Sequence, residues 1–156
     1  MKRSILSLLG ALPLYLLAPS LAEARVIQNS SSTDFCIGVD QASTDEHARL
    51  KQFRCDGKPN QQWSAKRVKQ NALNFINKKS ELCMGVEDAR TDAGAPIRQY
   101  ECDGSENQKW MFAACPSGAR CMMNKKSELC VATERPGHDA ALIQAPCNAG
   151  PVWTGH

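Results

Sequence analysis

The chain has 156 residues, of which 19 are Lys or Arg and 16 are Asp or Glu, and its formal net charge is +3. This length suits a single domain. The near-neutral charge argues against nucleic acid as a partner, because such binding requires a clustered basic surface. The densest basic run, at Lys66, Arg67 and Lys69, is interpreted as part of a solvated hairpin.

The first 24 residues have the layout of a secretory signal peptide. A basic start at Lys2 and Arg3 is followed by an apolar stretch from Ile5 to Leu17 and a small-residue cleavage site at Ala22-Glu23-Ala24. A membrane anchor is the competing interpretation, but two prolines interrupt the stretch and it is shorter than the ~20 residues of a spanning helix. We therefore predict a signal peptide over residues 1–24 and a secreted mature chain, extracellular or periplasmic, without a membrane span.

Residues 25–156 contain one unit repeated three times. Cys36, Cys83 and Cys130 are spaced 47 residues apart, and the same spacing separates Trp63 from Trp110. The string Asn-Lys-Lys-Ser-Glu-Leu-Cys occurs at 77–83 and again at 124–130. Repeats of this size indicate stacked or radially arranged units. We place the three copies at about residues 25–70, 71–117 and 118–156.

Each unit is predicted to consist of short strands and polar turns. In the second copy, a strand at 75–76 enters a turn at 77–80, a second strand covers 82–84, and a turn-rich segment spans 88–94. Alternating residues at 97–102 indicate a third strand, and 110–112 a fourth, after a turn at 103–105. The mature region has no long 3.6-residue periodicity. About four strands in each of three copies predict a closed all-β domain of roughly a dozen strands.

All eight cysteines lie in the predicted mature chain, and an even count behind a signal peptide indicates a disulfide framework. The repeat favours one bond within each copy, Cys36–Cys55, Cys83–Cys102 and Cys130–Cys147. The remaining two, Cys115 and Cys121, flank a short loop and are expected to form a local fourth bond. Zinc is the rival interpretation, but no Cys-x-x-Cys pair occurs and the histidines lack ligand spacing, so no metal and no cofactor is predicted.

Two copies carry the signature Gln-x-Trp, within Asn60-Gln61-Gln62-Trp63 and Asn107-Gln108-Lys109-Trp110. In register with the cysteine repeat, this signature resembles the ricin B-type lectin family over roughly Val26 to His156. The resemblance implies a disulfide-stapled β-trefoil of three ~45-residue repeats, with a six-stranded barrel capped by three hairpins. It also implies that the signature tryptophans pack in the shared core.

The family's sugar site implies roles for particular residues. An aromatic ring two residues before the second cysteine stacks on the sugar, and the asparagine before the signature glutamine bonds ring hydroxyls. The glutamine is counted with the site, although its amide is interpreted as partly structural, and plain packing against the barrel is the alternative for the rings. In copy one, these are Phe53, Asn60 and Gln61. In copy two, they are Tyr100, Asn107 and Gln108. Copy three has Ala145 in place of the ring and Gly150-Pro151 in place of the amides, so it is expected to be scaffold.

One family feature is missing from every copy. The aspartate that accepts from two sugar hydroxyls, two residues after the first cysteine, is replaced by Gly38, Gly85 and Ala132. Three alternatives stay open: Asp40 in copy one, or Glu87 or Asp88 in copy two, supplies the acceptor from a shifted position; exposed backbone groups contact the sugar; or sugar binding has been lost. Turn-forming residues are the plainer interpretation of both aspartates.

The resemblance therefore predicts a secreted carbohydrate-binding module with up to two sugar sites and a glycan or polysaccharide as its partner. The alternative is a protein-interaction trefoil, such as a toxin cell-binding subunit acting with a partner toxin or enzyme chain, or a protease inhibitor. Catalysis is not predicted, because no nucleophile elbow, zinc-protease, P-loop or dinucleotide motif occurs. His47 and His138 lie in turn-like segments and are interpreted as surface residues.

Overall fold

The computed structural model describes residues 25–29, 32–69, 71–118, 120–147, 149–150 and 153–155. The predicted signal peptide, residues 1–24, lies outside these ranges. Within them, no helix has both the length and the apolar character needed to cross a bilayer.

Each repeat supplies four strands. Repeat one contains β1 (Arg25–Asn29), β2 (Ser32–Val39), the 3-10 turn η1 (Asp40–Ala42), β3 (Leu50–Arg54), η2 (Pro59–Gln61) and β4 (Gln62–Arg67). Repeat two contains β5 (Leu73–Asn77), β6 (Cys83–Val86), η3 (Glu87–Ala89), β7 (Ile97–Tyr100), η4 (Glu106–Gln108) and β8 (Trp110–Ala114). Repeat three contains β9 (Arg120–Asn124), β10 (Cys130–Thr133), β11 (Ala140–Ala145) and β12 (Trp153–Gly155).

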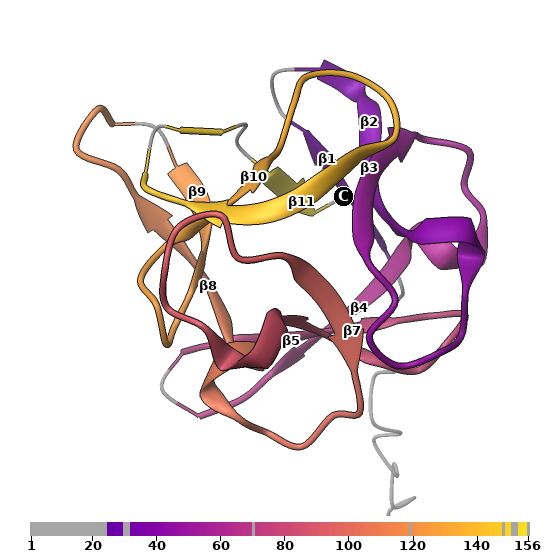
Figure 1. Ribbon diagram of the computed structural model, residues 1–156, viewed down its shortest axis with the longest axis horizontal. Helices are drawn as coiled ribbons and strands as arrows, with labels where there is room; N and C mark the ends of the chain where they lie inside the picture. The colour runs from indigo at the N-terminus through magenta and orange to yellow at the C-terminus, as the bar shows by residue number, and fades with distance from the viewer. Residues whose placement is uncertain are drawn as a thin grey trace, which may run out of the picture.

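The outer strands of the repeats form a barrel, and the inner two strands of each repeat form a hairpin. Antiparallel pairs join β12 to β1, β1 to β4, β4 to β5, β5 to β8 and β8 to β9. The hairpins β2–β3, β6–β7 and β10–β11 meet one another through the β3–β11 pair and single bridges at Arg49–Arg98 and Pro96–Ile143. Figure 1 shows the three repeats arranged around a common centre. The predicted all-β class and β-trefoil architecture are thus confirmed.

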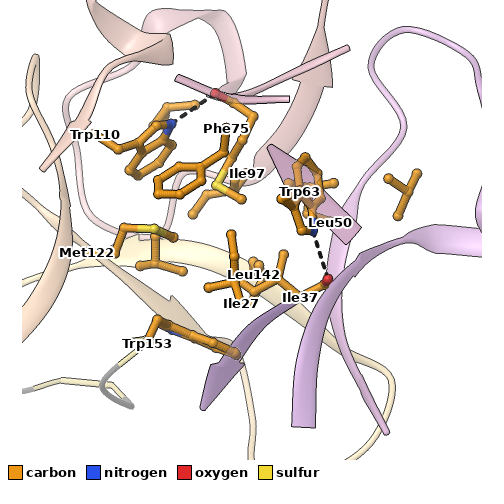
Figure 2. Packing of buried hydrophobic residues seen from close by; sticks show 14 of the residues in the cluster. Ile27, Ile37, Leu50, Trp63, Phe75, Ile97, Trp110, Met122, Leu142 and Trp153 are labelled. Atoms are coloured by element: carbon orange, nitrogen blue, oxygen red, sulfur yellow. Dashed lines mark hydrogen bonds between the residues drawn. The ribbon is translucent and has the colours of Figure 1, made fainter. Parts of the chain in front are cut away.

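The three signature tryptophans lie in the shared core, as predicted. Trp63, Trp110 and Trp153 are buried within one cluster of aliphatic and aromatic side chains (Figure 2). The indole Nε1 of Trp63 donates to the carbonyl of Ile37 at 2.9 Å, and that of Trp110 donates to Met84 at 2.9 Å. Truncating a buried tryptophan to alanine typically costs about 3–5 kcal/mol. These residues therefore stabilise the domain and are not available to a ligand.

The string shared by repeats two and three forms the turn between the first two strands of each repeat. The Oδ1 of buried Asn77 accepts from the backbone N–H groups of Lys79 and Ser80 at 3.0 and 3.3 Å. Its Nδ2 donates to the carbonyl of Asn60 at 3.0 Å. Asn124 makes the equivalent contacts in repeat three and donates to the carbonyl of Asn107 at 2.8 Å. Each turn is thereby fixed to the η segment of the preceding repeat.

A buried glutamine on the third strand of each repeat holds the loop of another repeat. Gln52 donates from Nε2 to the carbonyl of Gly137 at 2.9 Å. Gln99 donates to the carbonyls of Ser43 and Asp45 at 3.2 and 2.7 Å, and Gln144 donates to those of Arg90 and Asp92 at 3.1 and 2.8 Å. Since a buried amide is costly without partners, these glutamines position the loops between the inner strands. We call these contacts the glutamine clasps.

Two of the four predicted disulfides are confirmed and two are wrong. Cys36–Cys55 and Cys83–Cys102 form as predicted, each closing a sequence separation of 19 residues. In repeat three, however, Cys115 is bonded to Cys147 and Cys121 to Cys130. The predicted Cys130–Cys147 and Cys115–Cys121 bonds do not form, and no cysteine is free.

The physical reason is that all four cysteines of this region converge. Their Sγ atoms lie within 4.8 Å of one another, and those of Cys121 and Cys147 are 3.8 Å apart. Cys121 is on β9, which pairs with β10 beside Cys130, and it stands where repeat two has Asn74 next to Cys83. Spacing along the chain cannot distinguish partners when every pairing is within reach in space.

Candidate functional site

The predicted stacking residue of repeat one lies over a glycine. Phe53 pairs with Cys36 in the β2–β3 hairpin, so its side chain leans across the neighbouring position on the same face, Gly38. A Cβ atom on Gly38 would lie 3.0 Å from Cδ2 of Phe53 and 2.9 Å from Cγ of Gln61. The ring therefore occupies the volume that a side chain at position 38 would need, which explains the missing carboxylate.

Repeat two repeats this arrangement with Tyr100 over Gly85. A Cβ atom on Gly85 would lie 3.0 Å from Cδ2 of Tyr100 and 3.2 Å from Cγ of Gln108. The Tyr100 hydroxyl is buried and has no hydrogen-bond partner among the described residues. Burial raises the pKa of this hydroxyl above its usual value. The second ring is therefore packed more tightly into the protein than a free stacking platform would be.

The two predicted glutamines brace the chain that follows the third strand. Gln61 donates from Nε2 to the carbonyl of Arg54 at 3.0 Å and accepts from the N–H of Asp56 at 3.0 Å. Gln108 makes the matching pair of bonds to Glu101 and Asp103, at 2.7 and 3.3 Å. Both are buried. Because donor and acceptor of each amide are used within the protein, the structure gives these side chains a positioning role.

The two predicted asparagines differ in whether the side-chain oxygen already accepts a hydrogen bond. Each is buried, and Nδ2 donates to a backbone carbonyl, from Asn60 to Val39 at 3.4 Å and from Asn107 to Val86 at 3.1 Å. The Oδ1 of Asn107 also accepts from the hydroxyl of Ser105 at 2.7 Å. No described residue donates to Oδ1 of Asn60. Repeat one thus retains an acceptor that repeat two has already used.

A hollow of about 290 Å³ brings the repeat-one residues together. Its lining includes Phe53, Asn60 and Gln61 of repeat one and His138, which belongs to repeat three. We call it the repeat-one hollow. A ring beside a small number of polar groups is the combination that sugar recognition uses.

The two predicted aspartates do not line the repeat-one hollow. Asp40 forms an ion pair with Lys51 at 3.0 Å, and Lys51 reaches Asp139 of repeat three at 3.1 Å. The hydrogen bond to Asp40 is the main cause that raises the pKa of Lys51. Asp88 is exposed in η3, with a left-handed backbone at φ 49°. The structure therefore gives Asp40 a structural partner, and a shifted acceptor role for either residue stays a prediction.

Sequence reasoning missed two histidines that lie against the two rings. His138 of repeat three meets Phe53 of repeat one with ring centroids 5.7 Å apart, and its Nδ1 accepts from the N–H of Arg54 at 3.1 Å. His47 of repeat one meets Tyr100 of repeat two at 5.1 Å. Both are exposed, as interpreted from the sequence, but each is in contact with a predicted site. The only available signal was that both lie in the loop between the inner strands of their repeats, at adjacent positions of it.

Repeat three lacks this arrangement. Gly94 of repeat two stands at the position of His47, with its N–H bonded to the carbonyl of Gln144 at 2.8 Å, and the residue after Gln144 is Ala145 instead of a ring. A Cβ atom on Gly150 would lie 2.5 Å from Cβ of Ala132, so backbone fills the place of a ligand. A separate hollow of about 590 Å³ lies between the β10–β11 turn and repeat one. Its lining includes Phe35 and Glu134 but none of the predicted site residues.

The comparisons with known proteins agree with this fold. The sequence profile of one family, described as Ricin-type beta-trefoil lectin domain, matches residues 23–151. A search of curated proteins found no match.

Solved structures give the same result. The designed threefold-symmetric protein ThreeFoil is 23% identical with a TM-score of 0.75, over 84% of this chain and 97% of that one. An exo-beta-1,3-galactanase from Clostridium thermocellum is 21% identical with a TM-score of 0.77, over 88% of this chain but only 30% of the enzyme. The cytolethal distending toxin from Actinobacillus actinomycetemcomitans is 14% identical with a TM-score of 0.66, over 88% and 90% of the two chains. At these identities, the likeness shows the fold alone.

Proposed function

Because the chain belongs to the family of ricin-type beta-trefoil lectin domains, we propose that it is a secreted carbohydrate-binding module whose principal site is the repeat-one hollow. The observation that carries this proposal is the meeting of Phe53, the acceptor of Asn60 and the imidazole of His138 around one hollow. A pyranose offers C–H groups on one face and hydroxyl groups at its rim, which matches a ring flanked by polar atoms.

Repeat one is favoured over repeat two because its groups are less engaged by the protein itself. In repeat two, Ser105 occupies the asparagine acceptor and the Tyr100 hydroxyl is buried. Since a ligand must replace or avoid such internal contacts, we expect repeat two to bind more weakly. Repeat three, where Gly150 packs onto Ala132, is scaffold in this proposal.

The module is proposed to act by binding and not by catalysis. The galactanase that it resembles is much longer than the matched region, which covers only 30% of that enzyme. Secretion is part of this proposal; the predicted signal peptide supports it, as do four disulfides, which persist in oxidising compartments. Association with a partner toxin or enzyme chain stays a prediction, as does the alternative role as a protease inhibitor.

The test is a glycan array and polysaccharide pull-down with the oxidised mature chain. Binding glycans are then titrated against Phe53→Ala, which removes the proposed platform. We expect a loss of affinity of about two- to tenfold, since an aromatic contact is worth about 0.5–1.5 kcal/mol beyond its buried area. Phe35→Ala is the matched control, because this ring lines the other hollow.

Two outcomes would count against the proposal. If the folded protein binds no glycan or polysaccharide, the carbohydrate-binding function is wrong. If Phe35→Ala abolishes binding while Phe53→Ala does not, the function stands but the site lies in the other hollow. A far-ultraviolet circular dichroism spectrum for each variant shows whether the fold survives, because Phe53 is only partly buried.

A further inference from the structure

Each glutamine clasp holds the loop between the inner strands of one repeat against the hairpin of another. The clasp of Gln52 holds the loop that carries His138, the clasp of Gln99 holds the loop that carries His47, and the clasp of Gln144 holds the loop that carries Gly94. The three loops are therefore placed by the same kind of contact. Each loop is thereby held beside the ring position of a different repeat.

The two histidines reach their rings from adjacent positions of the loop. His47 is equivalent to Gly94, since each donates its N–H to the carbonyl of the clasp glutamine at 2.8 Å, and Asp139 shares their left-handed backbone. His138 instead corresponds to Glu46, whose Oε1 accepts from the N–H of Glu101 at 2.9 Å as Nδ1 of His138 accepts from Arg54. Docking of the loop consequently does not need an imidazole, and what His138 adds is its ring beside Phe53.

The hydrogen bond to His138 determines which of its nitrogens can donate. Nδ1 accepts from the N–H of Arg54 at 3.1 Å, so the neutral imidazole carries its proton on Nε2. His138 lines the repeat-one hollow together with Phe53 and Asn60. The hollow then has a ring, an acceptor at Oδ1 of Asn60 and a donor at Nε2 of His138. A sugar hydroxyl both donates and accepts, and the two polar groups offer it one partner of each kind.

We propose that His138 is a ligand-binding residue of the repeat-one hollow and that its Nε2–H donates to a hydroxyl oxygen of a pyranose stacked on Phe53. This inference rests on the proposed function. The site is then composed of two repeats, with the platform and acceptor from repeat one and the donor from repeat three. The site then has a donor where the family has an accepting aspartate, so the pattern of hydroxyls that is recognised differs from that of the parent family.

The test uses two substitutions, each of which can reproduce the hydrogen bond of only one of the two imidazole nitrogens. The amide of His138→Asn can reproduce the acceptor at Nδ1 and keep the bond from Arg54, but it offers nothing at Nε2. The amide of His138→Gln can reproduce the donor at Nε2 and loses the acceptor near Arg54. Affinity is measured by nuclear magnetic resonance titration with methyl glycosides of galactose, glucose, mannose, xylose, N-acetylgalactosamine and N-acetylglucosamine, with the Phe53 ring signals reporting on the site.

We expect His138→Asn to weaken the tightest of these sugars by about three- to tenfold, as loss of one neutral hydrogen bond does, and His138→Gln to retain most of the affinity. Asp139→Asn is the control for disturbance of the same turn, because asparagine tolerates the left-handed backbone at φ 60°. It should bind like the wild type.

The opposite ranking, with His138→Asn binding normally and His138→Gln weakened, would show that the imidazole only supports Arg54 and would overturn the inference while leaving the proposed function intact. Equal affinity in all variants would overturn it in the same way. If no sugar in the panel moves the Phe53 signals of the wild type, the proposed function fails at this hollow and the inference fails with it.

Discussion

The ring of Phe53 lies directly on the backbone of Gly38, so closely that a Cβ atom there would approach Cδ2 of the ring to 3.0 Å. The same relationship holds for Tyr100 and Gly85. Loss of the family carboxylate and inward packing of the ring are therefore two aspects of one arrangement. The part of the Phe53 ring that packs on Gly38 is not accessible to a ligand, so a sugar can contact only the remaining surface of the ring.

This relationship predicts that restoring the aspartate will destabilise the domain. Gly38→Asp should lower the free energy of unfolding by about 1–3 kcal/mol, the usual cost of overpacking a filled site. The double variant Gly38→Asp with Phe53→Ala should be less destabilised than the sum of the two single variants, because the collision is removed. Urea unfolding of all four proteins measures this coupling. Additive effects would show that the ring and position 38 do not compete for space.

The buried hydroxyl of Tyr100 predicts a stabilising substitution. Tyr100→Phe removes an oxygen that has no hydrogen-bond partner among the described residues, so stability should be unchanged or raised by up to about 1 kcal/mol.

The pH dependence of the same variant gives a second measurement. Burial raises the folded-state pKa of Tyr100 above 10.0, so the unfolded chain releases the proton first as pH rises. The free energy of unfolding of the wild type should therefore fall above about pH 10, and by less in Tyr100→Phe. Thermal unfolding of both proteins between pH 8 and 11 tests the difference, and parallel curves would contradict it.

The cysteine cluster predicts an unequal cost for its two bonds. Cys115–Cys147 closes a separation of 32 residues and Cys121–Cys130 one of 9. On the chain-entropy model, their loss should cost about 3.7 and about 2.6 kcal/mol respectively. Paired alanine substitutions compared by urea unfolding measure this ranking. Peptide mapping of the oxidised protein should recover both bonds, and a peptide that joins Cys130 to Cys147 would contradict the pairing.

The turn asparagines predict a structural cost remote from any ligand. Asn77→Ala leaves the carbonyl of Asn60 and two backbone N–H groups without their partner, so we expect a loss of about 2–3 kcal/mol. Lys78→Ala, an exposed change in the same turn, should stay within about 0.5 kcal/mol of the wild type. Denaturant unfolding compares the two, and similar values would show that the buried amide is dispensable.

Much of the architecture could be predicted because it is encoded within each repeat. The 47-residue spacing, the alternating strands and the turn residues act over a few neighbouring positions, and three copies of one unit allow few closed arrangements. The core role of Trp63, Trp110 and Trp153 was implied by the family resemblance that their Gln-x-Trp signature carries, and the structure confirms it. The two disulfides of repeats one and two also followed, because each joins the two strands of one hairpin.

What the tertiary structure alone decided are the contacts between repeats. The sequence by itself determined three units and their strands, since those depend on local periodicity and turn chemistry, whereas the ring and amide positions were implied by the resemblance to the family. It did not reveal that His138 meets Phe53, that Cys115 bonds Cys147, or that the ring of Phe53 excludes a side chain at Gly38. These depend on distances between atoms that the closure of the barrel and the meeting of the hairpins bring together, and spacing along a chain carries no measure of such distances.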